Sequence, residues 1–238
     1  MNNVLCMKWG RKYPAVYVNT LYAMVARQLE PPFRFVCCTD DRDGIRPEVE
    51  CRDLPAIDLG GSPYQYAWRK LSVFSPELHD LDGHVLFLDL DLVLVDRLEP
   101  FFTYPGRFCI IENWTQPGRN VGNSSVFRFQ AGDFREVFDR FQDDPAGLIR
   151  SHPNSQTLMS GLIADKTWWP DAWCRSFKRH ALPRWPWRLI RRPKLPEGVK
   201  ILVFHGDPKP SDAARGVWPE KRRRIRPAPW IDDYWREA

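Results

Sequence analysis

The stretch VLFLDLDLVLV, residues 85–95, is the most informative part of this chain, because two aspartates interrupt a continuous apolar run. The four apolar residues before Asp89 are typical of a central strand that is buried on both faces. Two carboxylates in such a setting cost free energy unless a partner compensates their charge. Residues i and i+2 of a strand point to one side, so Asp89 and Asp91 can face one divalent cation. Alternatively, they cap a neighbouring helix or pair with Lys or Arg.

The sequence around this stretch predicts an α/β fold. An apolar run over residues 4–7, an amphipathic helical pattern over 13–29 and a β-rich run over 33–39 form a β-α-β opening. Such an opening favours parallel pairing, and ligands bind beyond the carboxyl ends of the strands in an open α/β sheet. Further strands are expected over residues 85–88, 108–111, 125–129 and 200–204, and further helices over 66–78 and 134–141.

Length and composition limit the classes of protein that this chain can be. With 238 residues, 43% of them hydrophobic and 27% charged, it is expected to fold without disulfides. No apolar run approaches the roughly 20 residues that span a bilayer. The six cysteines include no C-x-x-C pair, which argues against a zinc site, and the start shows no export signal. We therefore expect a cytoplasmic protein with reduced thiols.

The C-terminal third differs from the rest of the chain. It holds eight of the 11 tryptophans, and from Arg175 to Ala238 there are 17 Lys/Arg against 7 Asp/Glu. Prolines interrupt any helical pattern after Trp168, so we expect an irregular, basic, Trp- and Pro-rich extension that begins near residue 168. We assign residues 1–210 to one domain and 211–238 to a basic aromatic tail. The basic runs over 188–194 and 221–226, with tryptophans nearby, suit an anionic membrane surface or a solvated basic face.

Asp89-Leu90-Asp91 resembles the D-x-D motif of nucleotide-sugar glycosyltransferases of the GT-A (Rossmann-like) fold. The whole chain looks most like glycosyltransferase family 8, the retaining branch with glycogenin and bacterial lipooligosaccharide galactosyltransferases. That family carries a C-terminal H-x-x-G-x-x-K-P-W motif. Here residues 205–210 are similar, with His205 as the histidine and Lys209 in the K-P pair, although the glycine follows the histidine directly and no tryptophan follows Pro210.

The resemblance implies a metal set of Asp89, Asp91 and His205. Two carboxylates and an imidazole suit Mn²⁺, or Mg²⁺ as the alternative. Lys209 would place a positive charge on the diphosphate of the donor and assist catalysis.

Three further segments resemble family motifs. Asn123 begins N-S-S-V, similar to the family's N-[SA]-G-V, in which asparagine contacts the sugar or acceptor. Gln156 matches the glutamine of a D-Q pair beside the anomeric carbon, with Ser155 in place of the acid. Lys70, with Arg69 as the fallback, occupies the place of the arginine that holds the diphosphate and ribose.

Two loops after the first two predicted strands could contact the nucleotide. Lys8 and Trp9 begin a basic, aromatic loop that could stack on the base and touch phosphate. Thr39 and Asp40 follow the second strand and could contact uracil or ribose. These assignments rest on position alone.

Together these features predict a metal-dependent glycosyltransferase that moves a sugar from a nucleotide diphosphate donor, with UDP favoured, to a hydroxyl group. The resemblance implies retention of anomeric configuration. The acceptor would be a carbohydrate or a lipid-linked glycan of surface polysaccharide or glycolipid synthesis. The basic C-terminal region would then place the protein peripherally on the inner face of the cell membrane.

Two other functions fit parts of the sequence. Asp89-Leu90-Asp91-Leu92-Val93 also satisfies the first motif of haloacid-dehalogenase-like phosphatases, in which Asp89 would be the nucleophile. That motif usually lies near the N-terminus with glycine after the second aspartate, unlike Leu92 here. A nucleic-acid-binding role for the basic, Trp-rich region leaves Asp89, Asp91 and His205 without a purpose, so nucleic acid is the less favoured partner.

Overall fold

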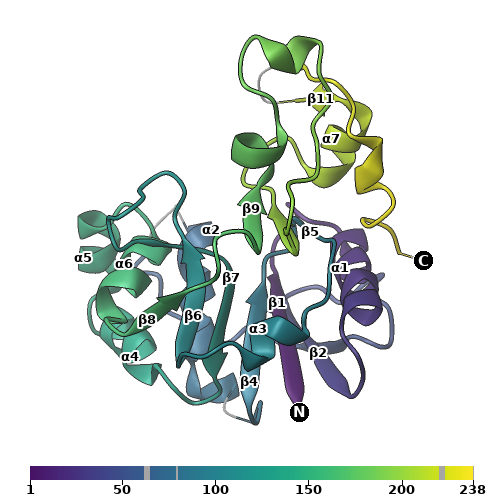
Figure 1. Ribbon diagram of the computed structural model, residues 1–238. Coiled ribbons are helices and arrows are strands. Elements are labelled where there is room, and N and C mark those ends of the chain that lie inside the picture. Colours follow the sequence, from purple (N-terminus) through teal and green to yellow (C-terminus); the bar gives the residue numbers. More distant parts are fainter. Residues whose placement is uncertain (62–64, 79, 220–222, 238) are drawn as a thin grey trace.

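The computed structural model describes residues 1–61, 65–78, 80–219 and 223–237. A seven-stranded sheet forms its centre, with helices on both faces (Figure 1). The strands of this sheet are β1 (Asn2–Lys8), β2 (Phe33–Thr39), β3 (Glu50–Arg52), β4 (His84–Leu88), β6 (Phe108–Glu112), β7 (Gly122–Gln130) and β8 (Lys166–Trp168). Their order is β3-β2-β1-β4-β7-β6-β8; only β7 runs antiparallel to its neighbours. The expected α/β fold with a mixed, mostly parallel sheet is confirmed.

Alternating residues of the central strands face two apolar cores. Val4 and Leu86 point into one core, which α1 covers, whereas Leu5 and Phe87 point into the other, which packs against α4 and α6. Each such side chain stabilises the fold by about 1.5–3 kcal/mol when fully buried. The helices are α1 (Ala15–Gln28), α2 (Gln65–Trp68), α3 (Glu99–Thr103), α4 (Arg135–Asp143), α5 (Pro145–Ser151), α6 (Ser155–Leu162) and α7 (Pro210–Arg215).

A second, three-stranded sheet joins the middle of the chain to its C-terminal part. It contains β5 (Leu92–Leu94), β9 (Cys174–Ser176) and β10 (Ile201–Val203), in the order β5-β10-β9. β5 begins directly after Asp91, and β10 pairs with it in antiparallel register, so that Val203 lies opposite Leu92. Because β10 pairs with β5, the segment after β10 lies close to Asp89 and Asp91. This segment begins with Phe204 and His205.

The helix expected over residues 66–78 is only partly correct. The four-residue α2 is followed by 3₁₀ turns over Arg69–Phe74 and Pro76–Leu78. Ser75 is extended between the two turns, because a residue before proline avoids helical backbone angles. The interruption still leaves Lys70 on the first turn after α2.

The expectation of a single short strand beyond residue 168 was also wrong. β9, α7, β11 (Val217–Trp218) and β12 (Arg223–Arg224) lie there as well. Each spans between two and six residues, which is too short to show a hydrophobic period. The signals for α7 are Pro210 at its start and Gly216, with a φ of 77°, just after its end.

The part of the chain after residue 210 packs onto the rest of the protein. Ala213 and Ile231 are fully buried in the core that also contains α1, and the Trp235 ring lies 5.3 Å from that of Tyr17. The assignment of residues 211–238 to a separate tail stays a prediction. Among the described residues, no helix combines the length and apolar character that crossing a membrane requires.

The edge strand β3 carries an ion-pair cluster. Arg52 pairs with Glu50 at 2.5 Å and with Asp80 at 2.6 Å, and Arg34 pairs with Glu50 at 2.8 Å. Partial burial acts to raise the pKa of Glu50, but the hydrogen bonds from Arg52 and Arg34 outweigh it and lower this pKa. The hydrogen bond from Arg52 lowers the pKa of Asp80 as well.

These lowered pKa values make stability depend on acidity. Their contribution is fully present above the unfolded pKa values of about 4 and is lost as pH falls through the folded ones. Because the carboxylates are more than a third exposed, we expect Arg52→Gln to lower the free energy of unfolding by only about 1 kcal/mol at pH 7. Urea unfolding should show this difference shrinking between about pH 5 and pH 2. A difference that stays constant with pH would contradict the assignment.

Candidate functional site

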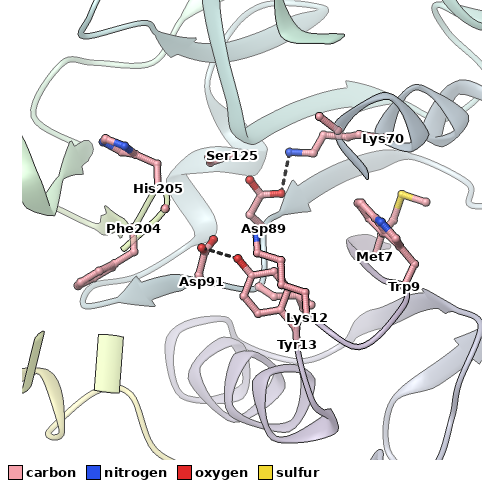
Figure 2. Close-up of a pocket in the computed structure, with 13 residues that line it drawn as sticks. Met7, Trp9, Lys12, Tyr13, Lys70, Asp89, Asp91, Ser125, Phe204 and His205 are labelled. Carbon is pink, nitrogen blue, oxygen red and sulfur yellow. Dashed lines mark hydrogen bonds and ion pairs between the residues drawn. The ribbon is translucent and has the colours of Figure 1, made fainter. Parts of the chain in front are cut away.

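A pocket of about 270 Å³ opens at the edge of the sheet where β1 and β4 end. Its walls come from the segment between β1 and α1, the turn after α2, the segment between β4 and β5, the start of β7 and the segment after β10. The carboxylates of Asp89 and Asp91 lie at its centre (Figure 2). The sheet therefore gathers polar side chains from distant parts of the sequence at its carboxyl edge, as expected for an open α/β sheet.

Asp89 is held at the base of the pocket by β7 and by a lysine. Its backbone N–H donates to the Ser125 carbonyl at 2.9 Å, and its carboxylate lies 2.7 Å from the Lys70 ammonium group. Burial raises the pKa of Asp89, the positive charge of Lys70 opposes this, and the negative charge of Asp91 adds to it. Lys70 also donates to the Ser124 carbonyl at 2.9 Å, which fixes its position. Lys70 thus lies beside Asp89. The buried carboxylate of Asp89 would also be stabilised by a further positive charge next to it.

Asp91 has two partners of its own. The Tyr13 hydroxyl donates to its carboxylate at 2.7 Å, and the Lys209 ammonium group lies 2.5 Å from the same oxygen. Lys209 donates to the Tyr13 oxygen as well, at 2.6 Å. Burial, together with the charge of Asp91, raises the pKa of Tyr13, so this hydroxyl stays protonated at neutral pH. Both aspartates therefore pair with lysines, one of the alternatives that the sequence left open.

His205 lines the pocket, but its ring points away from both carboxylates (Figure 2). Its Nε2 lies 2.8 Å from the Ser176 hydroxyl, and the Trp114 ring stacks on the imidazole at 6.2 Å. Burial and the nearby Lys178 and Arg179 lower the pKa of His205 to about 4, so the ring is neutral at pH 7. Within the described ranges, no group of three or more His, Cys, Asp or Glu is placed to hold a metal ion. The predicted set of three ligands is therefore not assembled in this structure, and it stays a prediction.

Trp9 lines the pocket, whereas the polar residues predicted with it form hydrogen bonds within and between the loops after β1 and β2. Lys8 donates to the Asp41 carbonyl at 3.1 Å, and Thr39 donates to the same carbonyl at 2.8 Å. The Asp40 carboxylate accepts a hydrogen bond from the backbone N–H of Gly10 at 2.9 Å. These contacts join the loops after β1 and β2 and so position Trp9. Direct contacts of Lys8, Thr39 and Asp40 with a nucleotide stay predictions.

Asn123 and Gln156 are not among the described residues that line the pocket, but both accept hydrogen bonds from backbone N–H groups at the start of β7. The Asn123 side-chain oxygen accepts from the Ser125 N–H at 3.1 Å. Gln156, in the first turn of α6, accepts from the Ser124 N–H at 3.4 Å. Ser125 lines the pocket, so the Asn123 amide contacts a residue of the pocket wall and the Gln156 amide contacts the residue before it.

Tyr13 and Lys12 also line the pocket; the sequence places both in the basic, aromatic loop after the first strand but assigns neither of them a role of its own. The helical pattern expected over residues 13–29 also places Tyr13 on its apolar face. In the structure α1 begins at Ala15, so Tyr13 precedes the helix and its hydroxyl is free to reach Asp91. The available signal was its place at the end of the basic loop after β1.

Comparison with family models gives no match, and comparison with curated proteins gives none either. Solved structures do match. The chain is similar to the galactosyltransferase LgtC, solved in complex with donor and acceptor sugar analogues, with 15% identity and a TM-score of 0.65 over 87% of this chain and 88% of that one. An active-site mutant of LgtC gives a TM-score of 0.66 at 15% identity, over 92% and 93% of the two chains.

Two larger proteins share the fold in part of their length. WbbM, a bifunctional glycosyltransferase, has 12% identity and a TM-score of 0.62 over 87% of this chain and 46% of its own. The glycosyltransferase GlyE of Streptococcus pneumoniae TIGR4 has 13% identity and a TM-score of 0.57, over 88% and 56%. These likenesses show a shared fold, and they confirm the GT-A fold that the D-x-D resemblance implied.

Proposed function

We propose that this chain is a glycosyltransferase that uses a divalent cation to move a sugar from a nucleotide diphosphate, with UDP favoured, to a hydroxyl group of its acceptor. The observation that carries the proposal is the pair of carboxylates after β4, set in a pocket that Lys70 also lines, with Lys209 paired to Asp91. The fold is shared with a galactosyltransferase that was solved with donor and acceptor sugar analogues.

The charged and aromatic groups of the pocket suit a nucleotide diphosphate. Trp9 and Met7 offer an apolar wall on the opposite side of the pocket from His205 (Figure 2), and an aromatic face there can stack on a base. Lys70 and Lys209 supply fixed positive charge near the two aspartates. Such charge stabilises the negative charge that develops on a departing diphosphate.

The pocket also fits the chemistry of Mn²⁺ or Mg²⁺. Its carboxylates are hard oxygen ligands, and burial together with the charge of Asp91 raises the pKa of Asp89, so positive charge beside this carboxylate is favourable. Asp89 and Asp91 would hold the ion, with the neutral His205 as third ligand after it leaves Ser176. Bound there, a divalent ion neutralises charge on the diphosphate as a Lewis acid. The ammonium groups of Lys70 and Lys209 would then turn from the carboxylates to the phosphates.

We propose that the transfer retains the anomeric configuration, as the resemblance to glycosyltransferase family 8 implies, and the lining of the pocket bears on how retention is achieved. Among the described residues that line the pocket, Asp89 and Asp91 are the carboxylates, and both are assigned to the ion. Attack of the acceptor hydroxyl on the same face as the departing diphosphate then fits best. Gln156 and Asn123, which border the start of β7, would orient the sugar and the acceptor.

The setting we propose is the synthesis of surface polysaccharide or glycolipid at the inner face of the cell membrane. A carbohydrate or lipid-linked acceptor would approach the pocket from the side of the C-terminal region. In Figure 1 this region rises from the sheet edge at which β1 and β4 end.

Calorimetric titration tests the donor site directly. We expect UDP to bind with a dissociation constant between about 1 µM and 1 mM in the presence of Mn²⁺, within the usual range for enzyme substrates. Without a divalent ion, binding should weaken at least about tenfold, because phosphate charge then faces two carboxylates. GDP is the matched control for the base.

The same titration can overturn the proposal. If neither UDP nor GDP binds with or without Mn²⁺, the proposed donor site does not exist. Phosphatase activity that needs no nucleotide, and that Asp89→Asn abolishes, would instead support the haloacid-dehalogenase-like function.

A further inference from the structure

We call the part of the chain after residue 168 the C-terminal lobe, and residues 184–192 within it the docking turn. A group of large apolar side chains is exposed on the docking turn. Trp185, Trp187, Leu189 and Ile190 are 66%, 49%, 51% and 61% exposed. Single exposed apolar residues are common, but four within six positions form a patch of the kind that marks an interaction site. The turn lies at the outer end of the lobe, drawn in green at the top of Figure 1.

Basic side chains are interleaved with this apolar group. The chain from Arg175 to Lys194 contains eight Lys/Arg and no Asp/Glu. The Arg188 guanidinium lies 5.2 Å from the Trp185 ring centre, and that of Arg191 lies 4.6 Å from Trp187. The partner of this surface therefore has to accept both apolar rings and positive charge.

The docking turn is held in place by the rest of the lobe. Its centre is a 3₁₀ turn over Trp187–Leu189, and Arg226 donates to the Leu189 carbonyl at 3.0 Å. Just beyond it, the Trp230 indole donates to the Pro193 carbonyl at 3.0 Å. The apolar side chains are thus presented on an ordered backbone, which lowers the entropic cost of binding.

We infer that the docking turn binds the headgroup region of an anionic lipid bilayer, with Trp185, Trp187 and Ile190 inserted and the arginines on lipid phosphates. Tryptophan concentrates at membrane interfaces, and Lys/Arg clusters bind anionic headgroups. The lobe carrying the turn rises from the sheet edge at which the pocket opens (Figure 1), so the bound protein would hold its pocket near the bilayer. This inference deepens the proposed function by siting its lipid-linked acceptor, but its test needs no nucleotide or acceptor.

Cosedimentation of the full chain with vesicles tests the inference. We expect binding to phosphatidylcholine vesicles that contain about 30% phosphatidylglycerol, and little binding to phosphatidylcholine alone. Trp187→Ser with Ile190→Ser should weaken binding at least about tenfold, since two inserted apolar side chains are lost. Arg191→Gln with Arg192→Gln should weaken it by about 10- to 30-fold, at about fivefold for each charge near the surface.

Matched pairs elsewhere on the protein serve as controls. Val16→Ser with Leu162→Ser removes two apolar side chains that are each 37% exposed, and Arg135→Gln with Arg140→Gln removes two charges from α4. Both should bind vesicles within about twofold of the wild type. Thermal unfolding of all four variants checks that loss of binding is not loss of fold.

Three results would overturn the inference. The first is vesicle binding that the control pairs reduce as much as the docking-turn pairs do. The second is binding to single-stranded RNA but not to anionic vesicles, and the third is self-association in solution that Trp187→Ser with Ile190→Ser abolishes. Failure of vesicle binding with intact UDP binding would remove only the membrane role, whereas vesicle binding without UDP binding would remove only the proposed enzyme.

Discussion

Asp91→Asn should lower kcat/KM for sugar transfer by at least about 10²–10³-fold, the size of effect seen when one preorganised charge-stabilising group is removed. The amide keeps the shape of the side chain but removes the negative charge that would hold a divalent ion. It also removes the partner of Lys209, whose ammonium group lies 2.5 Å from the carboxylate. Initial rates with a donor sugar identified after the UDP titration measure this effect, and calorimetry should show that Mn²⁺ no longer strengthens UDP binding.

This variant also tests whether Asp91 acts in the chemistry or only in the fold. Asp91 and Lys209 have side chains that are 9% and 14% exposed, so removing one charge leaves the other buried and costs about 3 kcal/mol of unfolding free energy. Asp91→Asn combined with Lys209→Met removes both charges and should recover most of that stability. If the double variant also recovers transfer, Asp91 has only a structural role.

Asp96→Asn is the matched control for this experiment. Asp96 lies just after β5, is half exposed and pairs with Lys200 at 2.5 Å, so the substitution removes an ion pair near the site but outside the pocket. We expect kcat/KM to stay within about twofold of the wild type, since exposed pairs contribute about 1 kcal/mol or less to stability. A comparable loss in both variants would contradict the assignment of Asp91.

Arg128→Met should lower the free energy of unfolding by about 3–5 kcal/mol. This is the largest effect on stability that we expect from any single substitution proposed for this protein. Arg128 lies in β7 with 1% of its surface exposed. Its guanidinium donates to the carbonyls of Phe102 at 3.3 Å and Tyr104 at 2.7 Å, and also to those of Phe101 and Gly106. Methionine fills similar space but leaves these buried carbonyls around the end of α3 without donors.

Guanidinium unfolding measures this loss, and two further variants separate its causes. Arg140→Met, on the exposed side of α4, removes the same group from the surface and should change the unfolding free energy by less than about 0.5 kcal/mol. Arg128→Lys keeps a charge but reaches fewer carbonyls, so it should lose about half as much as Arg128→Met. If Arg128→Met unfolds like the wild type, water replaces the guanidinium and the bonds to α3 do not stabilise the fold.

The elements with strong periodicity could be predicted from the sequence. The strand expected over residues 33–39 is β2, and the helix expected over 13–29 contains α1, because long apolar patterns report burial directly. The same pattern predicted that Asp89 and Asp91 lie together at the carboxyl edge of the sheet, because they follow a buried strand directly and their charges need compensation there. The short elements after residue 168 carry no such pattern and depend on tertiary packing.

The orientation of individual side chains was harder to predict. Lys8 and Thr39 are the last residues of β1 and β2, and Asp40 follows β2, yet all three form hydrogen bonds with backbone groups of the loops after these strands, as polar residues in short loops often do. The contact of Tyr13 with Asp91 depends on where α1 begins, and helix boundaries shift by a residue or two with capping.

The pairing of β5 with β10 sets the order in which the protein can acquire its pocket during synthesis. β1, α1 and β2 are close in sequence and can form as soon as they leave the ribosome. Asp89 and Asp91, which follow β4, are synthesised well before β10. Lys209 and His205 arrive only with the last sixth of the chain, after β10 has added to β5. Non-local pairings of this kind form late in folding. A nascent or truncated chain that stops before Lys209 would therefore display its paired carboxylates without the lysine that neutralises Asp91, and it would gain donor binding only after residues 205–209 have been synthesised.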